Sequence, residues 1–383
     1  PHTVELMPAE GSGCRNYQGP AWYRKHFVLP AETKGKRVVL HFEAAMGKQI
    51  LYLNGKRIQE HLGGYLPFTL DLTANGVQAG DSCLLAVFTD NSDDKSYPPG
   101  KRQYTLDFAY HGGIYRDVWM IAKSPVAITD AIDSQIVGGG GVFVHFDKIS
   151  EKSAQVYVNT EVQNDDARSE SVTVETTLTD ADGKVIKRSS GKLSLKPGEK
   201  KSIRQQMEVK NPTLWSPDTP YLYRVQSRIK KGNKSIDGGI TRVGIRLAEF
   251  RGKDGFWLNG KPYPYPLMGA NRHQDFAVIG NALPNSLHWR DAKKLRDAGM
   301  RVIRNAHYPQ DPAFMDACDE LGLFVIVNTP GWQFWNDQPI FAQRVYSDIR
   351  NMVRRDRNHP SVWMWEPILN ETWYPADFAK NVV

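Results

Sequence analysis

The stretch with the clearest chemical meaning lies between residues 359 and 374. An apolar run at residues 362–365 is followed by the pair Asn370-Glu371 and then by Trp373. A buried strand that carries a carboxyl group to its C-terminal end is how an α/β barrel presents a catalytic acid. The aromatic residues around the pair suit sugar rings, whose C–H faces pack on indole and phenol. The stretch therefore predicts a proton-donating carboxyl group in a carbohydrate site.

Polar side chains also follow three earlier predicted strands. A barrel gathers the C-terminal ends of its parallel strands at one face, where active sites form. We therefore expect these residues to converge on the same site as Glu371. They are Asn271 and His273 after the first strand, Arg304 and His307 after the second, and Asn328 after the third.

Each of these residues also has a non-catalytic interpretation. The two histidines can be ordinary hydrogen-bonded loop residues, and the arginine can form a structural ion pair. Trp332 and Trp335 can pack beneath a long loop. Glu366 alternates with Val362 and Met364 along the last predicted strand, and we interpret it as a partner in a structural salt bridge.

Length and composition limit the function classes. A chain of 383 residues suggests two or three domains. The net charge of +7 comes from 49 Lys and Arg residues spread along the whole chain without a dense basic block, so we expect no nucleic-acid partner. No apolar run reaches the roughly 18 residues of a membrane span. Cys14, Cys83 and Cys318 show neither metal-ligand nor disulfide-framework spacing, although a bridge between the first two stays open.

Two β-rich regions are predicted to occupy the first 247 residues. In residues 1–124, short strands are separated by turn signals such as Asn54-Gly55, a pattern typical of a jelly-roll β-sandwich. Residues 125–247 contain alternating runs, such as residues 154–162, in about seven strands, one of which is predicted at residues 193–197. That number is typical of an immunoglobulin-like β-sandwich.

The spacing of apolar residues changes in residues 248–383, where four short predicted strands alternate with predicted helices. Asp311-Pro312 provides an N-cap and a first-turn proline for one helix, and Gly322 ends it. Strict alternation of strands and helices indicates parallel βαβ units. A complete (β/α)₈ TIM barrel needs eight strands and roughly 250 residues, so this region is predicted to be the first half of such a barrel.

At this point the sequence resembles glycoside hydrolase family 2, which includes β-galactosidases, β-glucuronidases and β-mannosidases. The order of the three predicted domains matches that family along the whole chain. The motifs that carry the resemblance are Gly113-Ile114-Tyr115-Arg116-Asp117-Val118, Trp215-Ser216-Pro217, Gly269-Ala270-Asn271-Arg272-His273, Arg304-Asn305-Ala306-His307-Tyr308-Pro309 and Asn358-His359-Pro360-Ser361-Val362 leading to Asn370-Glu371.

The resemblance implies a retaining exo-β-glycosidase, with a β-galactosidase-like activity favoured. In that mechanism one carboxylic acid protonates the leaving oxygen, and a second, about 5–5.5 Å away, attacks the anomeric carbon. Glu371 corresponds to the acid/base, Asn370 to the residue that binds the sugar 2-hydroxyl, and Arg304 to the partner of the nucleophile.

The other family positions correspond to substrate-binding or supporting residues. These are Asn271, His273, His307, Trp373 and Asp107, which lies where the family often sends an acidic side chain from the jelly roll into the sugar pocket.

Two departures from the family pattern bear on mechanism. Val327-Asn328 stands where many members have Asp-Glu, so we expect no metal and no cofactor. The nucleophilic glutamate of the family follows a later strand, so we expect it to be missing from this chain. The alternative interpretation is a non-catalytic carbohydrate-binding or scaffold fragment.

The expected partner is an oligo- or polysaccharide, with no membrane and with a homo-oligomer left open. The sequence starts at Pro1 without Met, so a signal peptide can already have been removed. We expect a periplasmic or secreted location rather than a cytoplasmic one.

Overall fold

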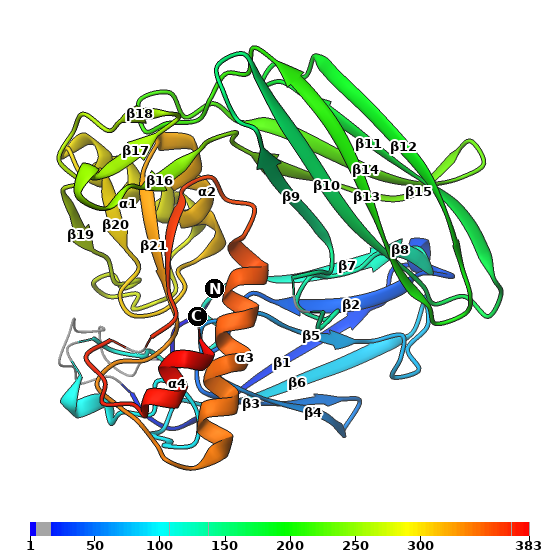
Figure 1. Ribbon diagram of the computed structural model, residues 1–383. Helices are drawn as coiled ribbons and strands as arrows, with labels where there is room; N and C mark the ends of the chain where they lie inside the picture. Colours follow the sequence, from blue (N-terminus) through cyan, green and yellow to red (C-terminus); the bar gives the residue numbers. More distant parts are fainter. Residues whose placement is uncertain (5–16, 107, 137, 369, 383) are drawn as a thin grey trace.

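The computed structural model describes residues 1–4, 17–106, 108–136, 138–368 and 370–382. Two β-sandwiches are followed by part of an α/β barrel, which confirms the predicted fold class. In Figure 1 the second sandwich, in green, lies above the first, in blue, and the yellow and orange barrel strands lie beside both.

The first sandwich is built from a four-stranded sheet in the order β1-β6-β3-β4 and a three-stranded sheet in the order β5-β2-β7. Asn54-Gly55 joins β3 to β4 as a hairpin, as predicted. Burial alternates along β2 and β3, whose inward residues form one apolar core. The strands are β1 (Pro20–Val28), β2 (Arg37–Phe42), β3 (Lys48–Leu53), β4 (Lys56–Leu62), β5 (Phe68–Asp71), β6 (Ser82–Asp90) and β7 (Val118–Lys123), with 3₁₀ turns at Ala31–Thr33 and Gln103–Thr105.

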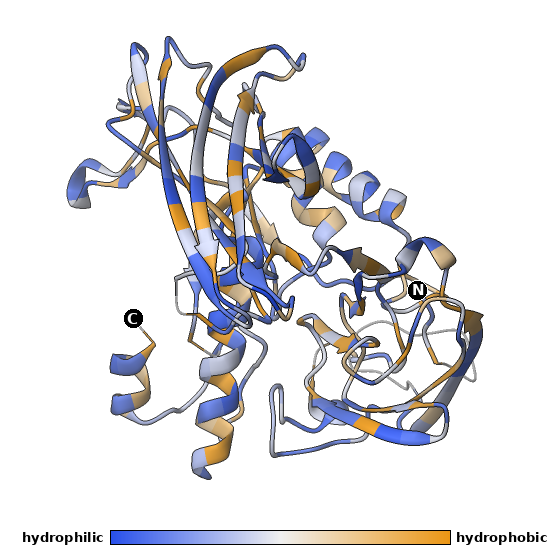
Figure 2. Ribbon diagram, turned by 90° about the vertical axis from the view of Figure 1, so that its right-hand side faces the viewer, coloured by the Kyte–Doolittle hydropathy of each residue, from blue (hydrophilic) through white to orange (hydrophobic). Residues whose placement is uncertain are grey.

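The second sandwich packs a sheet in the order β13-β10-β8, with β9 also on β10, against a sheet in the order β12-β11-β14-β15. Figure 2 shows hydrophobic and hydrophilic residues alternating along its long strands. The strands are β8 (Val126–Ile128), β9 (Val142–Asp147), β10 (Ser153–Asn164), β11 (Glu170–Thr179), β12 (Val185–Leu195), β13 (Lys200–Lys210), β14 (Tyr223–Lys231) and β15 (Lys234–Val243).

One strand assignment in this sandwich is wrong. Residues 193–197 were predicted as a separate strand, but residues 193–195 are the end of β12. A polar stretch at residues 187–190 precedes them in the same strand. It remains extended because β12 is an edge strand, where polar side chains on both faces are tolerated.

The barrel region contains four parallel strands in the order β19-β20-β21-β22, as predicted, preceded by a small antiparallel sheet that the sequence did not reveal. Helices α1, α2 and α3 cover an apolar core with these strands. The strands are β16 (Ala248–Phe250), β17 (Phe256–Leu258), β18 (Lys261–Pro262), β19 (Gly269–Asn271), β20 (Val302–Arg304), β21 (Phe324–Asn328) and β22 (Val362–Glu366), and a 3₁₀ turn spans Gly252–Asp254. The helices are α1 (Asn285–Asp297), α2 (Pro312–Leu321), α3 (Pro339–Asp356) and α4 (Ala376–Asn381).

The ends of α2 follow the predicted signals. The side chain of Asp311 caps the helix by accepting a hydrogen bond from the backbone N–H of Ala313 at 2.9 Å. Gly322 ends the helix with a φ of 74°, in the left-handed region that favours glycine. A Cβ at this position would lie 2.2 Å from the carbonyl oxygen of Pro217 in the second sandwich, so the glycine also permits that close approach.

A buried arginine of the jelly roll reaches into the barrel region. The guanidinium of Arg116 donates to the carbonyl of Tyr65 at 2.9 Å within its own domain. In the barrel region it donates to the carbonyl of Pro309 at 2.7 Å and to Oε1 of Gln274 at 3.0 Å. Its Nε lies 3.7 Å from a carboxylate oxygen of Asp311, and both side chains are almost fully buried. Arg116 therefore connects the two domains through charged and polar contacts.

The structure bears on two predictions, the burial of Cys318 and the lack of a membrane-spanning segment. Cys318 is buried, as predicted, and both it and Cys83 are free thiols. Cys14 lies outside the described residues. Among the helices of the described chain, none combines the length and the apolar character that crossing a bilayer would require.

Candidate active site

The loops after β21 and β22 are paired with each other, and this pairing fixes the backbone around Glu371. Trp332 and Asn370 form an isolated parallel bridge, and the backbone N–H of Gln333 donates to the carbonyl of Asn370 at 2.8 Å. Both Gln333, with a φ of 48°, and Glu371, with a φ of 47°, adopt the left-handed conformation. Their side chains leave this paired backbone at neighbouring positions.

The carboxyl group of Glu371 meets the side-chain amide of Gln333. Nε2 of Gln333 donates to Oε2 of Glu371 at 2.6 Å, and Oε1 of Gln333 accepts from Nζ of Lys101 at 2.6 Å. The ammonium group of Lys101 lies 3.9 Å from the ring centroid of Trp332. A lysine of the jelly roll, a glutamine and the candidate acid thus form one chain of contacts.

A pocket of about 750 Å³ opens beside Glu371. This volume lies within the usual range of small-molecule sites, about 300–1,000 Å³. Trp373 stands at the pocket with 97% of its surface exposed, so its indole face can be covered by a ligand. The lining residues are Gln333, Glu366, Ile368, Asn370, Glu371, Thr372, Trp373 and Tyr374.

Arg304 at the end of β20 organises the wall of this pocket. It forms a bidentate pair with Glu366 on β22, with Nε–Oε2 at 2.7 Å and Nη2–Oε1 at 2.5 Å. Its Nη2 also donates to Oδ1 of Asn370 at 2.9 Å. The salt bridge predicted for Glu366 is therefore present, and Arg304 is its partner. This contact places the amide oxygen of Asn370 on the arginine side, so its N–H donors lie on the other side of the amide.

His307 is held neutral behind this wall. Burial, followed by the charge of Arg304 and then the neighbouring His273, lowers the pKa of His307 to about 3. Nη1 of Arg304 lies 3.2 Å from Nδ1 of His307. A guanidinium can only donate, so Nδ1 is the acceptor and Nε2 carries the proton. The ring also stacks on Trp332 with centroids 6.0 Å apart.

The remaining predicted residues lie further from Glu371. His273 stacks on Phe108 of the jelly roll, with centroids 5.1 Å apart, and its ring lies 5.6 Å from that of His307. Asn271 is exposed at the end of β19, where it pairs in register with Arg304, and it does not line the pocket. Asp107 lies outside the described residues. The structure thus places Asn370, Glu371 and Trp373 at the pocket. Arg304 contacts the lining residues Glu366 and Asn370, and His307 contacts Arg304.

Sequence models of glycosyl hydrolase family 2 match almost the whole chain. The sugar-binding domain matches residues 5–125, the family's central domain residues 140–246 and the TIM-barrel domain residues 251–382. The chain belongs to glycosyl hydrolase family 2.

This family 2 chain is similar to several named proteins and to several solved structures. A β-galactosidase of Thermoanaerobacter pseudethanolicus is 33% identical over the whole chain, which covers 49% of that protein. A β-glucuronidase of Formosa agariphila is 32% identical over 91% of the chain and 36% of that protein. The structure of Bacteroides uniformis β-glucuronidase 2 covalently bound to cyclophellitol-6-carboxylate aziridine superposes over the whole chain and 45% of that protein, with a TM-score of 0.86 and 31% identity. The chain therefore spans half or less of the length of these relatives.

Sequence reasoning missed two residues that touch the candidate acid or its partner. Gln333 follows Trp332 after β21, in a loop whose conformation no local pattern predicts. Lys101 belongs to another domain and is 232 residues away from Gln333 in the sequence. The sequence left open whether Trp335 belongs to the site or packs beneath a loop. In the structure it packs in an apolar cluster against Phe341 and Phe378.

Within the described part of the chain, a single group of side chains has the spacing of a metal site, namely Asp316, Asp319 and His359. It lies around the end of α2 and the start of β22, at the opposite end of the strands from Glu371. Its oxygens already accept from protein donors: Asp319 from the N–H of Ser361 at 3.0 Å and from His359 at 2.6 Å, and Asp316 from Arg242 at 2.6 Å. These contacts are typical of a structural ion-pair cluster.

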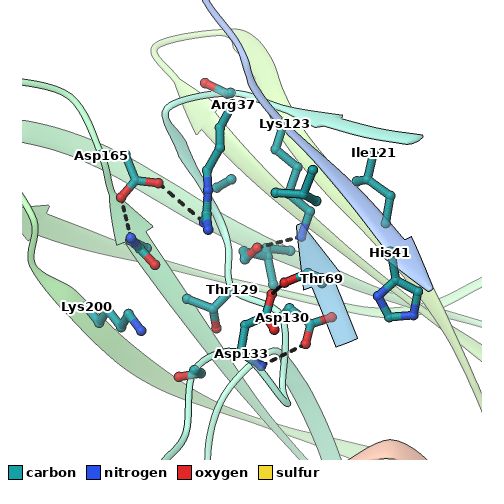
Figure 3. A pocket seen from close by; sticks show the side chains of 16 residues that line it. Arg37, His41, Thr69, Ile121, Lys123, Thr129, Asp130, Asp133, Asp165 and Lys200 are labelled. Carbon is teal, nitrogen blue, oxygen red and sulfur yellow. Dashed lines mark hydrogen bonds and ion pairs between the residues drawn. The ribbon is translucent and has the colours of Figure 1, made fainter. Parts of the chain in front are cut away.

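A second, smaller pocket lies between the two sandwiches and contains none of the predicted site residues (Figure 3). Its volume is about 150 Å³. Two contacts join its lining residues across the sandwiches: Arg37 pairs with Asp165 at 3.5 Å, and Asp133 accepts from Thr69 at 2.8 Å. These contacts indicate that the pocket lies at an interdomain junction.

Proposed function

We propose that this chain carries the proton-donating half of a retaining exo-β-glycosidase that hydrolyses terminal β-linked sugars, with Glu371 as general acid/base. The observation that carries the proposal is the pocket beside Glu371, which combines a carboxyl group, an amide and an exposed indole. Family membership supports the same activity, because relatives are β-galactosidases and β-glucuronidases.

In the first step of this mechanism, the proton of Glu371 passes to the leaving glycosidic oxygen as its bond to the anomeric carbon breaks. The resulting carboxylate then takes a proton from the water that releases the sugar. Glu371 is exposed at the pocket, so both the leaving group and the water can reach it.

The neighbouring residues are proposed to bind and orient. The amide N–H of Asn370 donates to a sugar hydroxyl, while Arg304 holds the amide in place through its oxygen. The face of Trp373 packs on a ring of the substrate. Neutral His307, which carries its proton on Nε2, and His273 support the sugar site from behind.

The nucleophile is proposed to come from outside these 383 residues. A retaining enzyme needs a second carboxyl group about 5–5.5 Å from the first. Glu366 lines the pocket, but both of its oxygens are bound to Arg304, which fits a structural role. The proposed activity therefore belongs to a longer polypeptide, in keeping with the share of its relatives that the chain covers.

Replacing Glu371 with Gln in the intact polypeptide tests this proposal. We expect kcat/KM for alkyl or disaccharide substrates to fall by about 10²–10⁴-fold, the usual contribution of general acid catalysis. Substrates with a 2,4-dinitrophenyl leaving group need little protonation and should retain far more of their glycosylation rate. Asp377→Asn, an exposed carboxylate on α4, is the matched control. Equal losses on both substrate types would reject the acid assignment.

The sugar itself is proposed to be β-galactose, since a β-galactosidase is among the relatives that match the whole chain. A panel of chromogenic β-glycosides tests this assignment, and a preference for β-glucuronides would overturn it. The alternative function is a carbohydrate-binding fragment without catalysis. An intact polypeptide that binds oligosaccharides but hydrolyses none of the panel would support that alternative.

A further inference from the structure

A loop of the jelly roll is docked on the loop that follows β21 and on α3. The carbonyl of Lys95 accepts from Nδ2 of Asn336 at 2.7 Å, and the carbonyl of Ser96 accepts from Arg344 at 2.6 Å. At Gly100 the two chains are so close that a Cβ would lie 2.4 Å from the ring of Phe334. These contacts fix the position of the next residue in the loop, Lys101.

The contacts of Lys101 determine how the Gln333 amide is oriented. An ammonium group can only donate hydrogen bonds, so the amide atom that faces Lys101 must be the oxygen. The NH₂ group of Gln333 therefore faces Glu371 and must be the donor. The same lysine is held over the ring of Trp332, which limits its own freedom.

We propose that Lys101 and Gln333 are positioning residues for the acid/base, so that the jelly-roll domain takes part in proton transfer through them. This inference rests on the proposed function of Glu371. An exposed glutamate loses rotamer freedom when it is held in one orientation, and the Gln333 hydrogen bond supplies that restraint.

The hydrogen bond also distinguishes the two oxygens of the acid. Oε2 of Glu371 accepts from Gln333, so Oε1 is the oxygen that carries the proton and hands it to the glycosidic oxygen. As the proton leaves, negative charge spreads onto Oε2. The N–H from Gln333, polarised by Lys101, then becomes a charge-assisted donor and is stronger in the transition state than in the ground state.

The test uses the intact polypeptide and two substrate types. We expect Gln333→Leu to lower kcat/KM by about 10–100-fold for substrates with poor leaving groups, because misplacing a catalytic group has effects of this size. Substrates with a 2,4-dinitrophenyl leaving group should lose less than about 3-fold, since they need little acid catalysis. Lys101→Met should show the same selectivity with a smaller loss, about 3–10-fold, and Lys101→Arg should restore at least half of the activity.

Two comparisons separate positioning from general damage. Lys95→Met removes the same charge from an exposed side chain in the same loop and leaves its carbonyl contact intact, so it should change neither substrate's rate by more than about 2-fold. The double variant of Lys101→Met and Gln333→Leu should resemble Gln333→Leu alone, because the lysine acts through the glutamine.

The outcomes distinguish this inference from the proposed function. If Glu371→Gln shows the leaving-group selectivity and Lys101→Met and Gln333→Leu do not, the positioning role is wrong while the acid assignment stands. If Glu371→Gln shows no selectivity, the proposed function itself fails. Independent, additive losses in the double variant would also overturn the inference. Lys101→Met keeps the test valid if Gln333→Leu does not fold, because Lys101 lies in a surface loop.

Discussion

Replacing Arg116 with Met should loosen the attachment of the jelly roll to the barrel region. The change removes a buried guanidinium that donates to Tyr65, Pro309 and Gln274. It also removes the cation that lies 3.7 Å from the carboxylate of Asp311, which is 2% exposed. Removing one partner of a buried ion pair costs about 3–5 kcal/mol. Met roughly preserves the side-chain volume, so the loss of polar contacts dominates.

Calorimetry of the intact polypeptide measures this loss. A change of 1 kcal/mol moves Tm by about 2–4 °C for a cooperative unit of 150–250 residues, so the expected decrease is about 6–20 °C. The Tm of Arg116→Lys should lie between those of the unchanged protein and Arg116→Met, because a single ammonium cannot reproduce the forked guanidinium contacts. Arg24→Met is the control, since Arg24 is exposed on β1. A Tm for Arg116→Met within 1–2 °C (roughly the scatter of surface substitutions) of this control would refute the reasoning.

Two further predictions concern stability. Burial alone would lower the pKa of His359, but its ion pair with Asp319 raises it to about 9, above the unfolded value of 6.5. The resulting stabilisation, at most about 3 kcal/mol, is complete below pH 6.5 and is lost as the pH rises through 9. Urea unfolding at several pH values should show this loss, and His359→Gln should abolish it. Gly322→Ala should lower Tm well beyond Gly299→Ala, whose positive φ is similar but whose Cβ meets no atom within 4 Å, because only Gly322 abuts Pro217. Equal Tm values would contradict this account.

The elements that the sequence predicted correctly are those encoded by local chemistry. The hairpin at Asn54-Gly55 and the two ends of α2 depend on conformations that particular residues favour within a few positions. The four parallel strands could be predicted because helices and strands differ in hydrophobic period. The end of β12 was misread because an edge strand carries polar residues without losing its extended conformation.

The candidate site was only partly predictable. Arg304 is the last residue of β20, and Asn370 and Glu371 belong to the loop that follows β22. Strand ends converge in a barrel whatever their neighbours are. The partners of Glu371 depend instead on how two domains dock, which residues far apart in sequence decide. Lys101 in the jelly roll has no motif of its own, and only its contact with Gln333 reveals its role.

The jelly roll contributes Arg116 to the interior of the barrel region and Lys101 to its rim, so the two domains are not interchangeable modules. A chimaera that takes its jelly roll from one family member and its barrel from another would have to transplant Gln274 with the arginine and Gln333 with the lysine. A chimaera that takes the two members of a pair from different parents would join two well-formed domains with mismatched polar contacts. Domain-shuffling libraries of such enzymes should therefore recover functional hybrids mainly when both pairs come from the same parent.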